Sequence, residues 1–257
     1  MKIPGFCPIC MKGKRAKTLY FNYNDDLILD IRECSNGHKV HGVLFAPKFE
    51  LFLTCGAEAL INGYSVEASF NFAAAREHLF MFAIKVMLNY DSFDNGTTKK
   101  YRAQYLDLSE RILGGFGTLY LLNYGKSFDI MKEDIIKAKR GSWANMTKFR
   151  NDLVHKGKIP SLDDAKTYGE IIYEEIKEIV EELSKKFYNN IFSTLSNTYN
   201  QNHENLNRVQ NEVDSRIDIT PFLIFNSAEY LGQKNCGGVD ASYNSFYSRL
   251  DLFEQRL

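Results

Sequence analysis

The sequence predicts a mainly α-helical protein preceded by a small β-rich region. Only five of the 257 residues are proline. None lies between Pro47 and Pro160, which suits long helices because an internal proline breaks them. Apolar residues in that stretch recur at helical spacing, whereas β-forming residues and most cysteines come earlier. We therefore expect a β region over 1–47, an all-α domain over 48–188 and a partly irregular C-terminal extension over 189–257.

The overall composition is that of a globular protein with balanced charge. Hydrophobic residues make up 44% of the chain and charged residues 25%, which excludes a charge-expanded disordered chain. The 32 basic and 32 acidic side chains cancel, so no global basic excess attracts nucleic acid. The N-terminus lacks the apolar segment of a signal peptide, and no apolar run is long enough to span a bilayer. We expect a cytoplasmic protein with no membrane partner.

Three short strands are expected in the first region, over 17–23, 27–32 and 40–45, because these segments are rich in β-forming residues. A turn is expected at 24–26, where the sequence is Asn-Asp-Asp. The region also has a basic excess next to Tyr20, Phe21 and Tyr23. These aromatic residues fit a nucleic-acid surface and a small core equally well.

Four cysteine and histidine residues in this region have the spacing of a zinc site. Cys7 and Cys10 flank Pro-Ile, and Cys34 and His38 flank Ser-Asn-Gly. Two close ligand pairs on turns, joined by a hairpin, suit one tetrahedral structural Zn²⁺ per chain, and such a small region needs the folding energy of a metal. The pattern resembles the short zinc ribbons over about residues 5–42. His41 is a competing ligand that better fits a strand, and the alternative is a hairpin with reduced cysteines.

Helical spacing is clearest in two segments. The first set of apolar residues is Phe72, Ala75, Leu79, Phe82 and Val86, and the second is Tyr168, Ile172, Ile176, Ile179, Leu183 and Phe187. The second helix should start at Ser161, which with Asp164 forms a variant capping box. Further helices are expected over 101–113, 118–122, 128–139 and 143–155, with a break at Gly114–Gly117 and a C-cap at Gly157. Another short helix is expected over 246–257.

The expected helix over 143–155 carries the most informative motif. Asn151 and His155 are four residues apart and share a helix face, and the long side chain of Arg150 can reach it. A guanidinium fork suits phosphate oxygens, and an imidazole can transfer protons near neutral pH. Lys148 on this helix and Lys156 directly after it are candidate substrate-binding residues. The alternative is that these are ordinary surface residues near a helix end, where a cation complements the helix dipole.

The motif and its surroundings resemble the HEPN superfamily of helical bundles. Arg150, Asn151 and His155 match its Arg-x(4–6)-His motif with a polar residue after the arginine, and 73–80 resembles a long preceding helix. The likeness covers about residues 50–188. It implies a homodimeric, metal-independent endoribonuclease that leaves a 2′,3′-cyclic phosphate and serves as a toxin or anti-phage abortive-infection effector. By this resemblance His155 transfers a proton, Arg150 stabilises charge on the phosphate and Asn151 positions it.

The balanced total charge hides a local separation that fits RNA as a partner. Residues 126–160 hold nine basic and four acidic side chains, whereas residues 163–182 hold two basic and eight acidic ones. We expect no catalytic metal, and an antitoxin or regulatory protein is a further possible partner. The alternative from another class is a non-catalytic module that binds nucleic acid or protein and in which the motif is structural.

Overall fold

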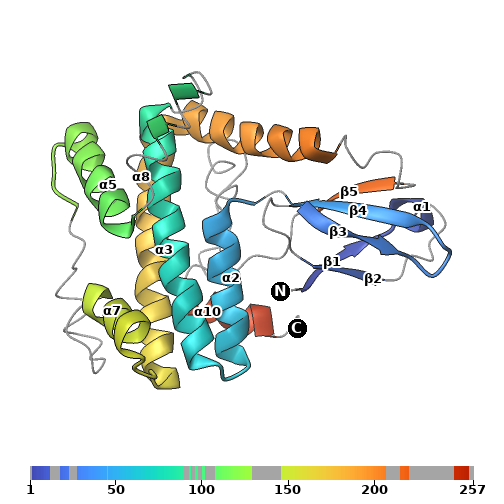
Figure 1. Cartoon of the computed structure of the whole chain (residues 1–257), viewed down its shortest axis with the longest axis horizontal. Coiled ribbons are helices and arrows are strands. Elements are labelled where there is room, and N and C mark those ends of the chain that lie inside the picture. Colours follow the sequence, from blue (N-terminus) through green and yellow to red (C-terminus); the bar gives the residue numbers. More distant parts are fainter. Residues whose placement is uncertain are drawn as a thin grey trace. The chain divides into compact units, whose positions relative to one another are not determined.

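The computed structural model of the chain describes residues 2–11, 18–22, 28–44, 46–89, 93, 96–97, 100–101, 108–128, 146–206, 215–219 and 246–254. They form mainly helices with small β-sheets near the N-terminus (Figure 1), which confirms the predicted fold class. Two compact units are present. The N-terminal unit comprises Met1–Pro47 and Leu195–Phe222, and the helical unit comprises Lys48–Thr194 and Leu223–Leu257. No helix in the described ranges has the length and apolar character to cross a membrane.

The N-terminal unit contains two small sheets. Strand β1 (Lys2–Phe6) pairs antiparallel with β2 (Thr18–Asn22), and the short helix α1 (Pro8–Met11) follows β1. Strand β3 (Ile28–Glu33) pairs antiparallel with β4 (Lys39–Leu44). The expected strands over 17–23, 27–32 and 40–45 are therefore confirmed to within two residues, whereas the turn at 24–26 lies outside the described residues.

The second sheet is extended by a strand from far along the chain. β5 (Ser215–Ile219) pairs in parallel with β4, in the register that places Val40 opposite Ser215 and Leu44 opposite Ile219. It also contacts α1 and β1. The C-terminal segment therefore completes the N-terminal unit, and neither β1 nor β5 was expected from the sequence.

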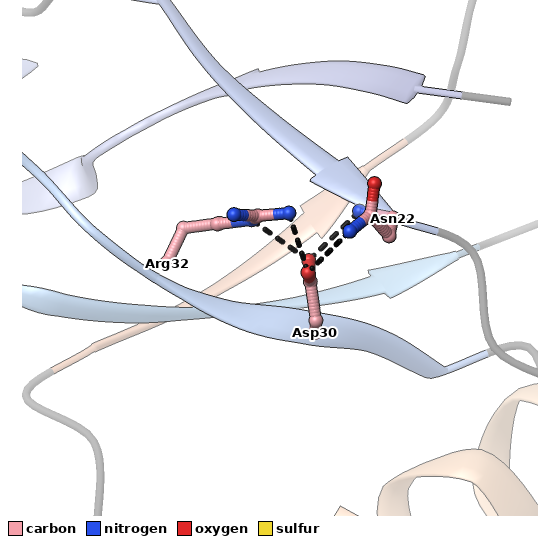
Figure 2. A network of polar contacts seen from close by, with 3 residues as sticks. All are labelled: Asn22, Asp30 and Arg32. Carbon is pink, nitrogen blue, oxygen red and sulfur yellow. Dashed lines mark hydrogen bonds and ion pairs between the residues drawn. The ribbon is translucent and has the colours of Figure 1, made fainter.

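Asp30 joins the two sheets through its carboxylate (Figure 2). Its Oδ1 accepts from the backbone amide of Asn22 on β2 at 2.8 Å, and its Oδ2 accepts from Asn22 Nδ2 at 3.0 Å. On its own strand, Arg32 Nε donates to Oδ1 at 3.1 Å and Nη2 lies 2.7 Å from Oδ2. One carboxylate thus links β2 to β3, and the neighbouring guanidinium of Arg32 supplies the opposite charge.

Helix α3 (Ser65–Leu88) is central to the helical unit. It packs against α2 (Lys48–Ile61), α5 (Ser109–Tyr124) and α7 (Met146–Lys156). Helix α8 (Leu162–Leu206) has non-helical backbone at Phe187, where two helical segments join. The short helix α10 (Phe246–Glu254) contacts α2 and confirms the helix expected near the C-terminus. Of the helix expected over 128–139, only Phe128 is among the described residues, and it is not helical.

Both ends of the loop between α7 and α8 are set by capping groups, as the sequence predicts. Gly157 has a left-handed φ of 63°, and the amide of Lys158 donates to the carbonyl of Asp152 at 3.1 Å, which closes α7. Ser161 Oγ accepts from the backbone amide of Asp164 at 3.0 Å and donates to the Asp164 carboxylate at 2.8 Å. These caps fix where the motif-bearing helix ends.

The expected helix break at Gly114–Gly117 is wrong, because α5 runs unbroken through these glycines. The helix is held by one buried face formed by Ile112, Phe116 and Tyr120. The ring of Phe116 stacks on that of Phe80 from α3, with centroids 4.6 Å apart. Tertiary burial of these aromatic side chains offsets the conformational cost of several glycines in one helix.

The core of the helical unit is organised around Phe72, which is fully buried. Its ring lies between two helical glycines, Gly56 of α2 and Gly169 of α8, and a Cβ at either glycine would come within 2.5 Å of the ring. Phe246 of α10 meets the same ring edge-on at a centroid distance of 6.1 Å. The two glycines therefore provide the space in which three helices approach one aromatic side chain.

Replacing Gly56 by Ala should lower the free energy of unfolding by about 1–2 kcal/mol, because overpacking against Phe72 outweighs the better helix propensity of alanine. Gly114→Ala is the matched control, since a Cβ at Gly114 meets nothing within 4 Å. That control should gain up to about 1 kcal/mol. Urea denaturation of both variants measures the difference, and equal stabilities would contradict the role given to Gly56.

Candidate functional site

Four of the predicted metal ligands come together in the N-terminal unit. Cys7 precedes α1 and Cys10 lies within it, while Cys34 and His38 bracket the turn between β3 and β4. That turn is closed by a hydrogen bond from the Gly37 amide to the Cys34 carbonyl at 2.9 Å, with Gly37 at a φ of 80°. All four ligand atoms lie within 4.8 Å of one another, which is close enough to hold one metal ion.

Four of the six distances between the ligand atoms match a tetrahedral zinc site, and all six are within 4.8 Å. Cys10 Sγ lies 3.7 Å from Cys34 Sγ, and His38 Nδ1 lies 3.5, 3.5 and 3.8 Å from the sulfurs of Cys10, Cys34 and Cys7. Zinc bonds of about 2.3 Å to sulfur and about 2.0 Å to nitrogen would put tetrahedral ligands about 3.5–3.8 Å apart. The donor set therefore fits Zn²⁺ in both chemistry and size.

The surroundings of the cluster favour the thiolate at Cys34, whereas the pKa of the Cys10 thiol is raised, because the hydrogen bond from Asn36, which lowers it, is outweighed by burial and the neighbouring thiols. All three sulfur-bearing side chains are buried, and Asn36 Nδ2 donates to Cys10 Sγ at 3.1 Å. Burial raises the pKa of the Cys34 thiol, but hydrogen bonds from the backbone at Asn36 and His38 bring it down to about 7. A lowered pKa favours the thiolate, which is the form that binds metal.

The other candidate thiol and imidazole lie elsewhere. His41 is buried on β4 and does not belong to the four-residue cluster, as its expected place on a strand implies. Cys55 lies on α2 in the helical unit, and burial raises the pKa of its thiol to about 11. Cys236 lies outside the described residues. Cys55 is therefore a partly buried thiol whose raised pKa disfavours the reactive thiolate, and it is a suitable control for substitutions of the cluster.

The Arg-Asn-x-x-x-His motif lies on α7, in the helical unit. Its apolar face buries Met146, Phe149 and Leu153, and the ring of Phe149 packs on Tyr168 of α8 with centroids 4.4 Å apart. Trp143, which was expected on this helix, lies outside the described residues. Because the apolar residues dock the helix, the polar motif residues are left on its other faces.

Arg150 and Asn151 line a cavity of about 90 Å³ between α3, α5, α7 and α8. Arg150 Nη2 donates to Glu77 Oε1 on α3 at 3.0 Å and to Ser109 Oγ on α5 at 3.1 Å. Arg150 Nη1 donates to the side-chain oxygen of Asn151 at 3.3 Å. The guanidinium is thus held by groups from three helices, with its side chain 25% exposed.

The third motif residue is not part of this cavity. His155 is exposed on the last turn of α7, and it is absent from the residues that line the cavity. The structure therefore brings Arg150 and Asn151 together within one chain and leaves the imidazole accessible beside them, one helical turn away.

The two candidate substrate-binding lysines share one carboxylate. Asp152 lies between them on α7, with its oxygens 3.5 Å from Lys148 Nζ and 2.6 Å from Lys156 Nζ. The hydrogen bond from Lys156 lowers the pKa of Asp152, and Lys148 adds to this effect. Both lysine side chains are more than half exposed, so they remain accessible. The shared carboxylate of Asp152 partly neutralises their positive charge.

A buried ion pair lies next to the cavity, and its arginine, Arg76, is one of the lining residues. Arg76 of α3 donates from Nε and Nη2 to the two carboxylate oxygens of Glu175 on α8, at 2.6 and 2.9 Å. Both side chains are about nine-tenths buried. Burial alone lowers the pKa of Arg76, but the Glu175 carboxylate more than offsets it, so the pKa is raised. The adjacent residues Arg76 and Glu77 therefore tie α3 to α8 and to α7.

Replacing Glu175 by Gln should lower the free energy of unfolding by about 3–5 kcal/mol, because it leaves the Arg76 guanidinium buried without its counter-charge. Glu181→Gln on the same helix is the control and should stay within about 0.5 kcal/mol of the parent. Chemical denaturation of the two variants measures the effect. A Glu175→Gln protein as stable as the Glu181→Gln protein would contradict this assignment.

Neither Ser109 nor the Arg76–Glu175 pair was identified from the sequence. A signal for the pair was present, because Arg76 is four residues after Phe72 and three before Leu79, within the apolar face of α3. An ionisable residue at such a position needs a buried partner. No comparable signal marks Ser109, whose contact depends on how α5 packs.

Comparisons of the chain with protein-family models, with curated proteins and with solved structures found no match. The function is therefore inferred from the site itself.

Proposed function

We propose that the chain is a metal-independent endoribonuclease of the HEPN type. The observation that supports this most is the pairing of Arg150 and Asn151 in one cavity with the exposed His155 a single turn away on the same helix. A guanidinium fork for a phosphate, an amide and a free imidazole are the groups that RNA cleavage through the 2′-hydroxyl requires. The basic excess around α7 adds attraction for RNA.

In the proposed reaction the 2′-hydroxyl oxygen attacks the neighbouring phosphorus. The bond from phosphorus to the 5′ oxygen breaks, and the products are a 2′,3′-cyclic phosphate and a 5′-hydroxyl. His155 carries a proton from the attacking hydroxyl or to the leaving oxygen. Arg150 stabilises the charge that develops on the phosphate, and Asn151 positions it. DNA is not cut because it lacks the 2′-hydroxyl.

Glu77 and Ser109 have a supporting role in this proposal. They hold the Nη2 end of Arg150, so the guanidinium is fixed before a phosphate reaches Nε or Nη1. Because the imidazole lies outside the cavity, we propose a homodimer in which the motifs of two copies face one another. Sedimentation equilibrium of the full chain tests the dimer, and a monomer at assay concentrations would contradict it.

The test of the activity is incubation of the full chain with cellular RNA in EDTA, followed by analysis of the RNA ends. Cleavage with 2′,3′-cyclic phosphate and 5′-hydroxyl ends is the expected result. Zinc content is measured in the same samples, so that an effect of EDTA on the N-terminal unit is recognised. The absence of cleavage of any cellular RNA would overturn the proposal.

A non-catalytic role is the second candidate, and one observation favours it. Arg150 already has three hydrogen-bond acceptors in its own chain, as expected for a structural arginine. The module would then bind nucleic acid or protein without cutting. RNA that is retained by the protein but recovered intact would support this candidate over the ribonuclease.

For the N-terminal unit we propose one structural Zn²⁺ held by Cys7, Cys10, Cys34 and His38. A closed set of four protein ligands leaves no open position for chemistry, so the metal serves folding. As a biological setting we propose a toxin or anti-phage effector in the cytoplasm, with an antitoxin or regulatory protein as its partner. Growth arrest on induction, absent with His155→Ala, is the expected result in cells.

A further inference from the structure

The cavity beside Arg150 has apolar walls. Ala73 and Phe80 of α3, Leu113 of α5 and Met146 of α7 line it. Phe80 and Met146 are almost fully buried, at 2% and 3% exposure. The Phe80 ring is already covered by the Arg76 guanidinium, 4.9 Å from its centroid, and by Phe116, so it contributes apolar surface rather than an open stacking face. Walls of this kind accept a flat apolar face rather than a hydrated ion.

The charges of the cavity do not favour a second phosphate. Arg76 is already paired with Glu175, and Arg150 is paired with Glu77. Glu110 adds an exposed carboxylate to the lining. The paired charges cancel and an acidic residue remains, so an anion gains nothing by entering beyond Arg150. A neutral group is the better occupant.

Hydrogen-bonding groups remain for such a neutral occupant. Among contacts between described residues, Glu175 accepts only from Nε and Nη2 of Arg76, which leaves Nη1 as a donor. Glu77 uses Oε1 for Arg150, and Asn151 uses only its oxygen, which leaves Glu77 Oε2 as an acceptor and Asn151 Nδ2 as a donor. The edge of a nucleobase carries both hydrogen-bond donors and acceptors, and its faces are flat and apolar. Donors and an acceptor beside apolar walls therefore match such a base.

The size of the cavity restricts the base. Its volume is about 90 Å³, which corresponds to the share of about three water molecules in the liquid. A buried cavity of about 150 Å³ is known to hold one benzene ring, so two fused rings do not fit here. This cavity is smaller than that but open to solvent on one side, so a single-ring base can enter it in part, with its sugar outside the opening.

We propose that this cavity, lined by Ala73, Phe80, Met146 and the free ends of Arg76 and Glu77, binds a pyrimidine base of single-stranded RNA. The inference rests on the proposed function, since the base is that of a nucleotide next to the phosphate held by Arg150. It gives the ribonuclease a preference for cytidine or uridine at one position beside the cut. The carboxylate of Glu77 suits the amino group of cytosine in particular.

Nucleoside binding to the full chain tests this site without reference to cleavage. The methyl groups of the six methionines are labelled with ¹³C, and the resonance of Met146 is identified with Met146→Leu. Cytidine and uridine should shift this resonance, and adenosine should shift it much less. Ala73→Leu fills the cavity and should weaken binding roughly tenfold or more. Ala74→Leu on the same helix, outside the lining, should bind like the parent.

Because Ala73 is buried, a second variant guards against a folding defect. Thr147 lines the cavity from α7 at an exposed position, and Thr147→Phe should also weaken binding. An unshifted Met146 resonance in the parent, or undiminished binding by both filling variants, would overturn the inference, and equal binding of adenosine would overturn its restriction to one ring. RNA cleavage without nucleoside binding would overturn the base site alone. Binding without cleavage would overturn the proposed ribonuclease alone.

Discussion

Replacing His155 by Ala should reduce the rate of RNA cleavage by about 10²–10⁴-fold, the usual contribution of a proton-transferring side chain. The stability of the protein should change by no more than about 0.5 kcal/mol, because His155 is exposed at the end of α7. Cleavage is measured in EDTA, and stability by thermal unfolding of the same preparations. The separation of the two effects makes this variant more informative than a change at Arg150, which would also leave Glu77 without its ion-pair partner.

Val154→Ala is the matched control for this experiment. Val154 is 39% exposed and directly precedes His155 on α7, so its truncation removes surface from the same helical turn without touching the motif. Cleavage by this control should equal that of the parent. If His155→Ala and Val154→Ala cut RNA equally well, the imidazole does not take part in the reaction, and the non-catalytic role becomes the better account of the motif.

The elements that the sequence predicted best are those controlled by local physics. The start of α8 at Ser161 and the end of α7 at Gly157 follow from capping groups that act within a few residues. The cluster of Cys7, Cys10, Cys34 and His38 follows from two close ligand pairs, one at α1 and one on the turn between β3 and β4. The hairpin expected between the pairs is wrong, because β2 pairs with β1 and β3 pairs with β4. In each case the information lies in the spacing of neighbouring residues, which is directly readable.

The elements that sequence reasoning missed depend on contacts between distant segments. β5 is a strand because β4, far earlier in the chain, offers it an edge. α5 stays helical through Gly114–Gly117 because Phe116 stacks on Phe80. The contacts of Glu77 and Ser109 with Arg150 require three helices to be placed first. Such pairings leave no periodic signal in a single sequence, so the composition of the cavity could not be derived before the fold.

If the proposed zinc is bound, stripping it from the N-terminal unit should unfold that unit while the helical unit stays folded. Binding of a structural zinc contributes about 10–16 kcal/mol in small zinc domains, far more than the short strands of this unit can supply by burial. The core of the helical unit is built from its own aromatic residues and does not use the cluster. Removal of the metal by a strong chelator, or by Cys7→Ser combined with Cys34→Ser, should therefore abolish the unfolding transition of the N-terminal unit. The unfolding transition of the helical unit should be preserved.

Hydrogen exchange provides the sharpest measurement of this effect, because β5 lies nearly two hundred residues after the ligands in sequence yet pairs with β4 of the same unit. If zinc holds the unit together, amides of Ser215–Ile219 should lose protection when the metal is removed, together with those of Lys39–Leu44. Amides of α3 should keep theirs. Cys55→Ser is the control and should retain one zinc per chain and full protection. A double-serine protein that keeps β5 protected would show that the sheet is stable by itself, and the cluster would then have no role in folding.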